Sequence, residues 1–438
     1  MYNHPDFGFY YIDGSSKKFY IYTSKKPEQE GGEPIPVTLT NEDLADDSFQ
    51  FCDGITNTNP INFQNCICCY VKFTTYFTDP LIDRPMTVKE VINEDESNPV
   101  QLGVFTVKSD TLSADGKTRE IIAYDAMYDI VNKDATNWYN SLEFPISIRT
   151  LRASLANEFS LQEAQGSLIN DDILIPRQID ENSTINAAAI LKCIGEINGV
   201  FPHINRFGVL TYIGMDMENP FPSPLYPSSS TFPGSRTFPD KDFNNEIFEV
   251  TKNYYKEDSV VWADYTTLKP DAVQIRDEYN EIVYNTNEGA TNPYTVINNI
   301  LCYGLTETQY QTIGYRIFNK IKDFTYTPYQ AVFMGNPCLE VGDRIIVRVK
   351  DNKKFYSYIL TKRIEGIITQ FEEVTAPGSL YLNQYTVGNG QLKNLERRVG
   401  NIENSGSGPL QIQSVAELPA QPQLNVLYLI QGEYVEVI

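Results

Sequence analysis

The chain has 438 residues, enough for about three domains of average size. It carries 35 Lys and Arg against 57 Asp and Glu, a formal net charge of −22, which disfavours stable binding to DNA or to an anionic membrane because both require a basic surface. Aromatic residues make up 12% of the chain, and the abundance of Tyr, Phe, Ile, Val and Thr among Pro, Gly and Asn favours strands joined by turns.

The first predicted unit is a β-barrel domain over residues 1–133. Apolar and polar residues alternate over 66–73, which predicts a half-buried strand. The sequence Ala-Asp-Gly-Lys at 114–117 predicts the turn of a hairpin between two strand-like segments. Several strands at such spacing are typical of a barrel or a sandwich.

Residues 134–218 are predicted to form an α+β insertion domain. In SIRTLRASLANEFS the apolar residues recur at spacings of three, four and four, which predicts an amphipathic helix. The segment STINAAAILKCIGEING predicts a second helix with a Ser or Thr N-cap and a stop at Gly199. A hairpin that turns at 205–208 is expected to follow.

A Pro/Ser-rich linker is predicted over 219–242, followed by a second β-barrel region over 243–385. Within this region TQYQTIGYRIFNKIKDF is expected to be a helical insertion. Alternating strands are expected on both sides of a tight turn at 351–353.

The C-terminal part is predicted to be a short coiled-coil stalk over 386–405 and a small β tip over 406–438. An apolar seam with spacings of three, four and three runs over two heptads, which is too short for an isolated coiled coil but sufficient to fix the register of subunits joined elsewhere. A single amphipathic helix on the body of the protein is the alternative. The seam residues are Leu392, Leu395, Val399 and Ile402, and the tip offers Tyr428 and Tyr434 as possible contacts.

The sequence contains few of the residues and motifs that usually serve in catalysis or metal binding. The two His of the chain, His4 and His203, do not provide a His-based dyad with its orienting group. The cluster Cys66, Cys68 and Cys69 lacks the second ligand pair of a zinc site, so these thiols are expected to pack in the core. GxSxG, HExxH, P-loop and GxGxxG motifs are absent from the sequence. We therefore expect no catalytic, metal or cofactor-binding residues and no enzyme activity.

Three segments together resemble the phage tail hub family, the tail-associated or baseplate hub proteins related to the spike bases of contractile injection systems. They are residues 39–77, where Gln64 stands at a position more often Gly, residues 101–134 and residues 335–378. The second segment is similar to a family hairpin and helix, and the third to the last strands of the second barrel. The resemblance rests on Leu102, Gly103, Phe105, Val107, Ala123, Tyr124, Asp125, Met127 and Tyr128, and on Pro337, Leu339, Gly342 and Asp343.

The resemblance implies a mainly β fold with two barrel domains and an α+β insertion. It further implies a homotrimeric ring at the distal tip of a virion tail, made in the bacterial host cytoplasm, that adapts a sixfold tail tube to a threefold tip. The implied partners are tail tube proteins and fibre or receptor-binding proteins. DNA would pass only in transit through the lumen, where acidic charge would repel it, and no stable membrane association is expected.

Two other functions remain open from the sequence. A tail-tip glycan hydrolase would need a pair of carboxylates ~5–10 Å apart in a cleft, and an acidic β-protein offers many candidates. A carbohydrate- or receptor-binding protein would present exposed aromatic residues on its C-terminal tip.

Overall fold

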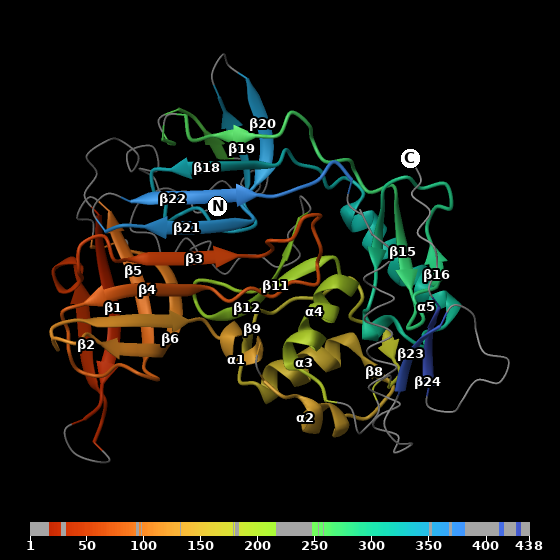
Figure 1. The fold of residues 1–438 in the computed structure, drawn as a ribbon, viewed down its shortest axis with the longest axis horizontal. Helices are drawn as coiled ribbons and strands as arrows, with labels where there is room; N and C mark the ends of the chain where they lie inside the picture. The colour runs from red at the N-terminus through yellow and green to blue at the C-terminus, as the bar shows by residue number, and fades with distance from the viewer. Residues whose placement is uncertain are drawn as a thin grey trace.

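The computed structural model describes most of the chain (Figure 1). The described residues are 17–27, 32–92, 96–97, 99–131, 133–177, 179, 184–215, 248–252, 254–256, 258–349, 353–367, 370–381, 411–415 and 426–430, the last two stretches as backbone. No helix in this part of the chain is long and apolar enough to cross a membrane.

The fold is mainly β, as the sequence predicts, and its largest element is a sheet of eleven strands. Neighbouring strands pair antiparallel along the whole sheet, which curves through the left half of Figure 1. In order across the sheet they are β14 (Val261–Trp262), β18 (Tyr329–Phe333), β22 (Phe371–Ala376), β21 (Thr361–Glu365), β3 (Gln50–Gly54), β4 (Tyr70–Thr75), β7 (Arg119–Tyr124), β6 (Val100–Leu112), β5 (Pro85–Ile92), β1 (Lys17–Lys25) and β2 (Ile35–Thr40).

This sheet unites the two β-rich regions of the sequence. Strand β21 pairs antiparallel with β3, with Arg363 opposite Cys52 and Ile364 opposite Phe51. Ile364 is fully buried among apolar side chains of β1 and β3–β7. The two regions therefore share backbone hydrogen bonds and part of one core.

The strand predicted over 66–73 begins later than expected. Strand β4 starts at Tyr70, and Cys66 and Cys68 lie before it in a segment that belongs to no strand. The predicted alternation is nevertheless present. Cys69 and Val71 face the apolar core enclosed by the eleven-stranded sheet, whereas Cys66 and Cys68 pack against a second apolar core that contains the helices. Periodicity alone did not reveal where the ladder of hydrogen bonds starts.

The predicted hairpin at 114–117 is confirmed as the β6–β7 turn. Ser113 and Thr118 close it by a backbone hydrogen bond of 2.8 Å. Gly116 adopts φ +71°, a conformation that costs little only without a Cβ atom. The Asp115 carboxylate accepts a hydrogen bond from the Ser113 hydroxyl at 2.7 Å.

Helices and small sheets form the second part of the molecule. The helices are α1 (Met127–Val131), α2 (Thr136–Asn140), α3 (Ile148–Glu158), α4 (Ala187–Ile197) and α5 (Glu307–Ile321), with 3-10 turns at Asn41–Asp43 and Ile300–Cys302. The smaller sheets pair β8 (Ile146–Ser147) with β10 (Leu174–Ile175), β11 (Val200–Ile204) with β12 (Val209–Gly214) and β9 (Gln162–Glu163), β13 (Phe248–Val250) with β19 (Arg344–Arg348) and β20 (Lys354–Tyr358), β15 (Ala272–Arg276) with β16 (Ile282–Asn285) and β17 (Pro293–Val296), and β23 (Gln411–Val415) with β24 (Val426–Ile430).

The helices expected at 148–159, 183–199 and around 308–324 are all present, but one N-cap residue differs. The N-cap of α4 is Asn186, whose side chain accepts from the Ala188 N–H at 2.8 Å, and not the Ser or Thr upstream. An amide oxygen fills this role as well as a hydroxyl. Gly199 ends α4 with φ +60°, as predicted, and the β11–β12 hairpin turns at 205–208.

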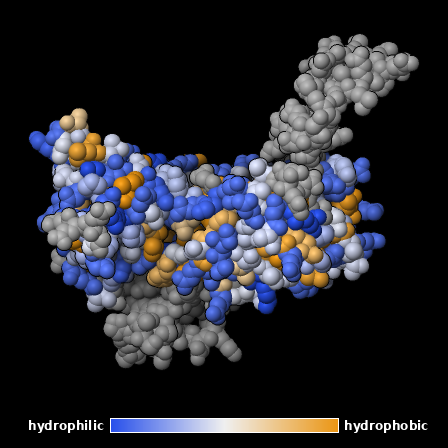
Figure 2. Space-filling model, turned by 90° about the horizontal axis from the view of Figure 1, so that it is seen from below, coloured by the Kyte–Doolittle hydropathy of each residue, from blue (hydrophilic) through white to orange (hydrophobic). Residues whose placement is uncertain are grey.

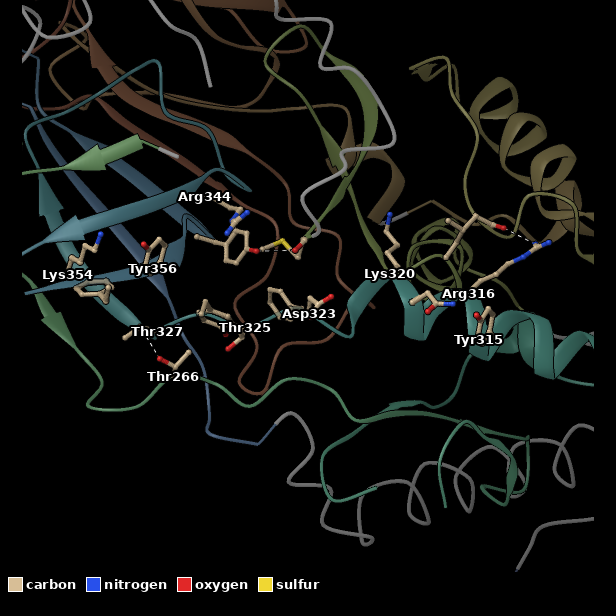
Figure 3. A pocket seen from close by; sticks show the side chains of 17 residues that line it. Thr266, Tyr315, Arg316, Lys320, Asp323, Thr325, Thr327, Arg344, Lys354 and Tyr356 are labelled. Carbon is tan, nitrogen blue, oxygen red and sulfur yellow. Dashed lines mark hydrogen bonds between the residues drawn. The ribbon is translucent and has the colours of Figure 1, made fainter. Parts of the chain in front are cut away.

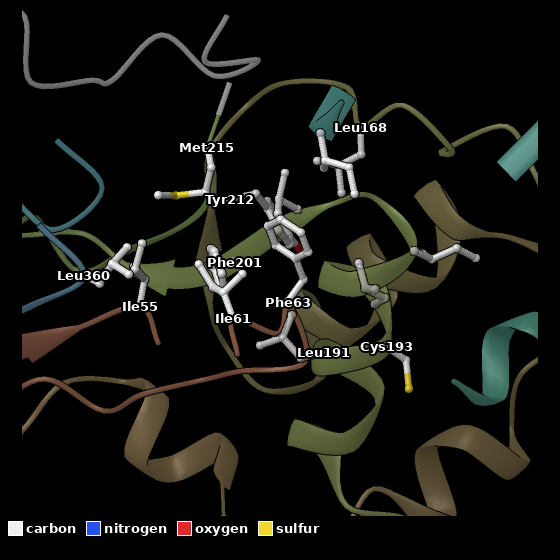
Figure 4. Close-up of a cluster of buried hydrophobic side chains, with 14 of the residues drawn as sticks. Ile55, Ile61, Phe63, Leu168, Leu191, Cys193, Phe201, Tyr212, Met215 and Leu360 are labelled. Atoms are coloured by element: carbon white, nitrogen blue, oxygen red, sulfur yellow. The ribbon is translucent and has the colours of Figure 1, made fainter. Parts of the chain in front are cut away.

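A large apolar core lies between the insertion and the second β-rich region (Figure 4). Ile55, Ile61 and Phe63 enter it from the chain after β3, and Leu360 enters from the residue before β21. Phe63 packs against Phe201 of β11 with ring centroids 4.7 Å apart. The insertion is thus anchored by residues far from it in sequence. The lower surface mixes hydrophilic residues with small hydrophobic patches (Figure 2).

Candidate functional site

The residues predicted as contacts lie mostly outside the described chain. Leu392, Leu395, Val399, Ile402 and Tyr434 are not among the described residues. Tyr428 belongs to β24, which pairs in parallel with β23.

The three clustered cysteines occupy core positions, as predicted. All seven cysteines of the chain are free thiols. Burial raises the pKa of the Cys66 thiol to about 12, so it stays protonated and poorly reactive near neutral pH. Within the described residues, no three His, Cys, Asp or Glu side chains come together as a set able to hold a metal ion.

His203 is buried in β11. Its Nε2 atom lies 3.7 Å from an Asp53 carboxylate oxygen of β3. Its backbone carbonyl accepts a hydrogen bond from the Thr211 hydroxyl across the β11–β12 hairpin.

The feature best suited to contact a partner is an open groove of about 900 Å³, between the C-terminal half of α5 and the β19–β20 hairpin (Figure 3). We call it the α5–β20 groove. It is lined by Ile169, Met215, Thr266, Tyr315, Arg316, Asn319, Lys320, Asp323, Phe324, Thr325, Tyr326, Thr327, Arg344, Lys354, Phe355, Tyr356 and Tyr358.

Two periodicities place the lining side chains. On β20, Lys354, Tyr356 and Tyr358 share one face because successive strand residues point to opposite sides. Arg344 on β19 lies opposite Tyr358 in the antiparallel register. On α5, residues four apart such as Arg316 and Lys320 follow one another along the same side of the helix.

The groove is basic although the chain is strongly acidic. Its lining contains four cationic side chains and one carboxylate, in a chain with a net charge of −22. Arg316 forms a two-point ion pair with Asp172, at 2.5 and 3.1 Å, and hydrogen bonding lowers the pKa of the Asp172 carboxyl. The carboxylate of the lining, Asp323, pairs with Lys269 at 2.9 Å. Lys320, Arg344 and Lys354 are the other cationic side chains of the lining.

Exposed aromatic rings accompany these charges. Tyr315 is 63% exposed and Tyr356 is 47% exposed. The Lys354 ammonium lies 5.7 Å from the centroid of the Tyr356 ring, within cation–π range. Cation and ring together form a surface suited to acidic and aromatic groups of a partner.

Buried aromatic residues lie beneath the exposed side chains of the groove. Phe324, Tyr326 and Tyr358 pack with ring centroids 5.4 to 6.1 Å apart. The Tyr358 hydroxyl donates to the Met215 carbonyl at 3.1 Å, and the Tyr326 hydroxyl donates to the Pro377 carbonyl. These two hydroxyls are bound to the backbone, which fixes the position of the buried rings.

A second polar cluster joins the two halves of the large sheet. Lys17 of β1 donates to the carbonyls of Met334 and Gly335 and to the Gln370 side chain, at 2.7 to 3.0 Å. Lys362 of β21 contacts the Glu372 carboxylate of β22 at 3.0 Å, with both side chains almost fully buried. These charges hold together segments far apart in sequence.

Glu196 of α4 forms a third polar centre, inside the main core. Its carboxylate accepts from the Gln64 amide at 2.5 Å, the Asn299 amide at 2.9 Å and the Tyr294 hydroxyl at 3.3 Å. Burial raises the pKa of Glu196 to about 7 despite these donors. Gln64 thus connects the chain after β3 to this buried carboxylate.

Sequence reasoning missed the α5–β20 groove. Its two walls come from segments about 35 residues apart, and each segment alone reads as an ordinary helix or strand with a solvated face. The alternation Lys354-Phe355-Tyr356-Ser357-Tyr358 was the available signal, since it places a cation and two tyrosines on one face.

No family model and no curated protein sequence matches the chain, whereas several solved structures do. The chain is similar to the 43 kDa tail protein of prophage MuSo2 from Shewanella oneidensis, with a TM-score of 0.46 and 10% identity over 83% of this chain and 98% of that chain. It is similar to prophage tail protein gp18 from Listeria monocytogenes EGD-e, with a TM-score of 0.43 and 11% identity over 86% and 99% of the two chains. A chain of the Francisella PdpA–VgrG complex gives a TM-score of 0.44 and 11% identity over 83% and 53%.

The descriptions of these structures name tail proteins and a VgrG complex, at 10–11% identity and with TM-scores below 0.5. The role of this protein has to be argued from its own residues.

Proposed function

We propose that this chain is a non-enzymatic structural hub at the distal end of a phage or phage-like tail. In this proposal three copies form a ring that joins a sixfold tail tube to a threefold tip and docks fibre or receptor-binding proteins. DNA passes through the ring only in transit, and no cofactor or stable membrane association is involved.

The observation that supports this proposal most is the continuous sheet of eleven strands. It ties two β-rich regions into one body through the pairing of β3 with β21, strands that lie more than 300 residues apart in sequence. Buried charges such as Lys362 and Glu372 reinforce the same junction. A platform with shared hydrogen bonds and a shared core suits a protein that holds other proteins at fixed angles.

The proposal keeps the domain boundaries read from the sequence, 1–133, 134–218, 219–242, 243–385, 386–405 and 406–438. Leu392, Leu395, Val399 and Ile402 are the proposed trimer seam of the stalk, and Tyr428 and Tyr434 are proposed contacts of the tip. The hydrolase alternative requires two carboxylates facing each other in a cleft. The α5–β20 groove is lined by one carboxylate, Asp323, so this groove does not meet that requirement.

The solution mass tests the proposal. We expect light scattering to give a trimer near three times 49.8 kDa, both for the full chain and for a version ending at about residue 388. A trimer that becomes a monomer on truncation would mean that the seam at 392–402 makes the main contact between the subunits. Monomers in both cases would contradict a hub that assembles by itself.

A further inference from the structure

The turn between β15 and β16, residues 277–283, is an exposed, acidic and apolar projection that we call the β16 tip. It carries three carboxylates, Asp277, Glu278 and Glu281, within five residues. Tyr279 is 72% exposed, Ile282 48% and Val283 36%. So much apolar area on a surface turn is typical of a contact surface.

The β16 tip is held in one conformation by local hydrogen bonds. The Asp277 carboxylate accepts from the backbone N–H groups of Tyr279 and Glu281, both at 2.9 Å. The Arg276 guanidinium donates to the Asn280 carbonyl at 2.7 Å. An aromatic side chain on a preorganised turn loses little conformational entropy when it binds.

The β16 tip and the α5–β20 groove carry opposite charges, and both expose aromatic side chains. The tip presents carboxylates with a tyrosine and two aliphatic side chains, and the groove presents Lys320, Arg344 and Lys354 with the exposed rings of Tyr315 and Tyr356. Such pairing of opposite potentials selects a partner and fixes its orientation.

The two surfaces lie at different places on one chain. The carboxylates of Asp277 and Glu278 act on Tyr310, in the N-terminal part of α5. The groove begins at Tyr315, five residues further along α5, and extends past the end of the helix to Asp323; the residues that line it include none of the tip. A tip on one copy would therefore meet a groove on another copy. Contacts between two different surfaces are head-to-tail, and they close into a ring when the rotation between copies brings the last copy back to the first, as a threefold rotation does.

We propose that the β16 tip of one copy docks in the α5–β20 groove of the next copy, so that this contact forms the ring. The inference rests on the proposed trimer and names the surfaces that make it. Tyr279 is the central anchor, and the carboxylates of the tip face the lysines of the groove.

Charge reversal and its rescue test the contact on the full chain. Lys320→Glu with Lys354→Glu places like charges against the tip, and Glu278→Lys with Glu281→Lys does the same from the other side. We expect either double variant to weaken trimer association by ~10-fold or more in light scattering and sedimentation. Because each interface pairs one tip with one groove, the quadruple variant restores opposite charges everywhere and is expected to recover the trimer.

Matched controls separate this effect from a change in overall charge or in folding. Lys117→Glu and Glu288→Lys alter exposed charges away from both surfaces and are expected to leave the mass unchanged. Circular dichroism and melting temperatures should show that all variants are folded.

Each other outcome has a distinct meaning. A trimeric wild type that both reversals leave intact would overturn the docking and leave the trimeric hub standing. Dissociation by the reversals without recovery in the quadruple variant would also overturn the pairing of these two surfaces. A wild type that stays monomeric at all concentrations would overturn the trimer and the docking together.

Discussion

Glu196 is a carboxylic acid enclosed by the main core, and its titration affects the stability of the whole protein. Its pKa is about 7 in the folded state, compared with an ordinary value of 4.5. Between these two pH values the folded protein holds a proton that the unfolded chain has already released. The free energy of unfolding therefore falls as the pH rises through this window.

Glu196→Gln should remove this pH-dependent loss of stability and keep the shape of the site. The amide oxygen can accept from Gln64 and Asn299, and the amide nitrogen can donate to the Tyr294 hydroxyl. We expect the variant to be more stable than wild type at pH 8, by on the order of 2 kcal/mol, and close to wild type at pH 5. Melting temperatures at both pH values measure this.

The control is Glu158→Gln on the exposed side of α3, which should change stability little at either pH. A Glu196→Gln variant that is less stable than wild type at pH 8 would mean that the three donors stabilise the carboxylate more than burial destabilises it.

At the scale of elements, helix α5 and strand β16 approach each other closely at Gly314. A Cβ atom added at Gly314 of α5 would lie 2.5 Å from the Tyr284 ring of β16. Glycine is costly within a helix, by about 1 kcal/mol relative to Ala. Its presence here is explained by the close packing that carries the β16 tip.

Gly314→Ala should destabilise the protein by about 1–3 kcal/mol, because the clash with Tyr284 outweighs the gain in helix propensity. Thermal or denaturant unfolding at a fixed protein concentration measures the effect. The matched change Gln311→Ala, at an exposed position of the same helix, should stay within about 0.5 kcal/mol of wild type. In Gly314→Ala with Tyr284→Ala the clash is relieved, so the two losses should not add. A neutral or stabilising Gly314→Ala would show that the ring moves aside at little cost.

The whole molecule depends on the junction at which both β-rich regions share one sheet. Lys362 contacts Glu372 there, and the Glu372 carboxylate also accepts from the Asn336 N–H at 2.6 Å. Removal of one partner leaves the other charge buried, which typically costs about 3–5 kcal/mol.

Lys362→Met should therefore lower the melting temperature of the entire protein in a single calorimetric transition. Lys362→Met with Glu372→Gln removes both charges, keeps an acceptor for Asn336, and should recover part of the loss. Two separate transitions, with only one of them shifted by Lys362→Met, would mean that the β-rich regions unfold independently in spite of the shared sheet.

Features that depend on neighbouring residues could be predicted from the amino-acid sequence. The apolar spacing of 148–158 specified α3, and the Ala-Asp-Gly-Lys turn specified the β6–β7 hairpin. The alternation around Cys69 and Val71 placed these side chains in a core. Each of these signals lies within about one helical or strand period, so a local pattern is sufficient to read it.

The tertiary structure alone decided which distant segments meet. The β3–β21 pairing, the burial of Glu196 beside Gln64 and Asn299, and the joining of α5 and β20 in one groove all bring together residues separated by many tens to hundreds of positions. No local pattern carries such information, because side-chain periodicity specifies which face is buried but not which segment buries it. A pKa shift or a basic groove in an acidic chain arises only when those faces are brought together.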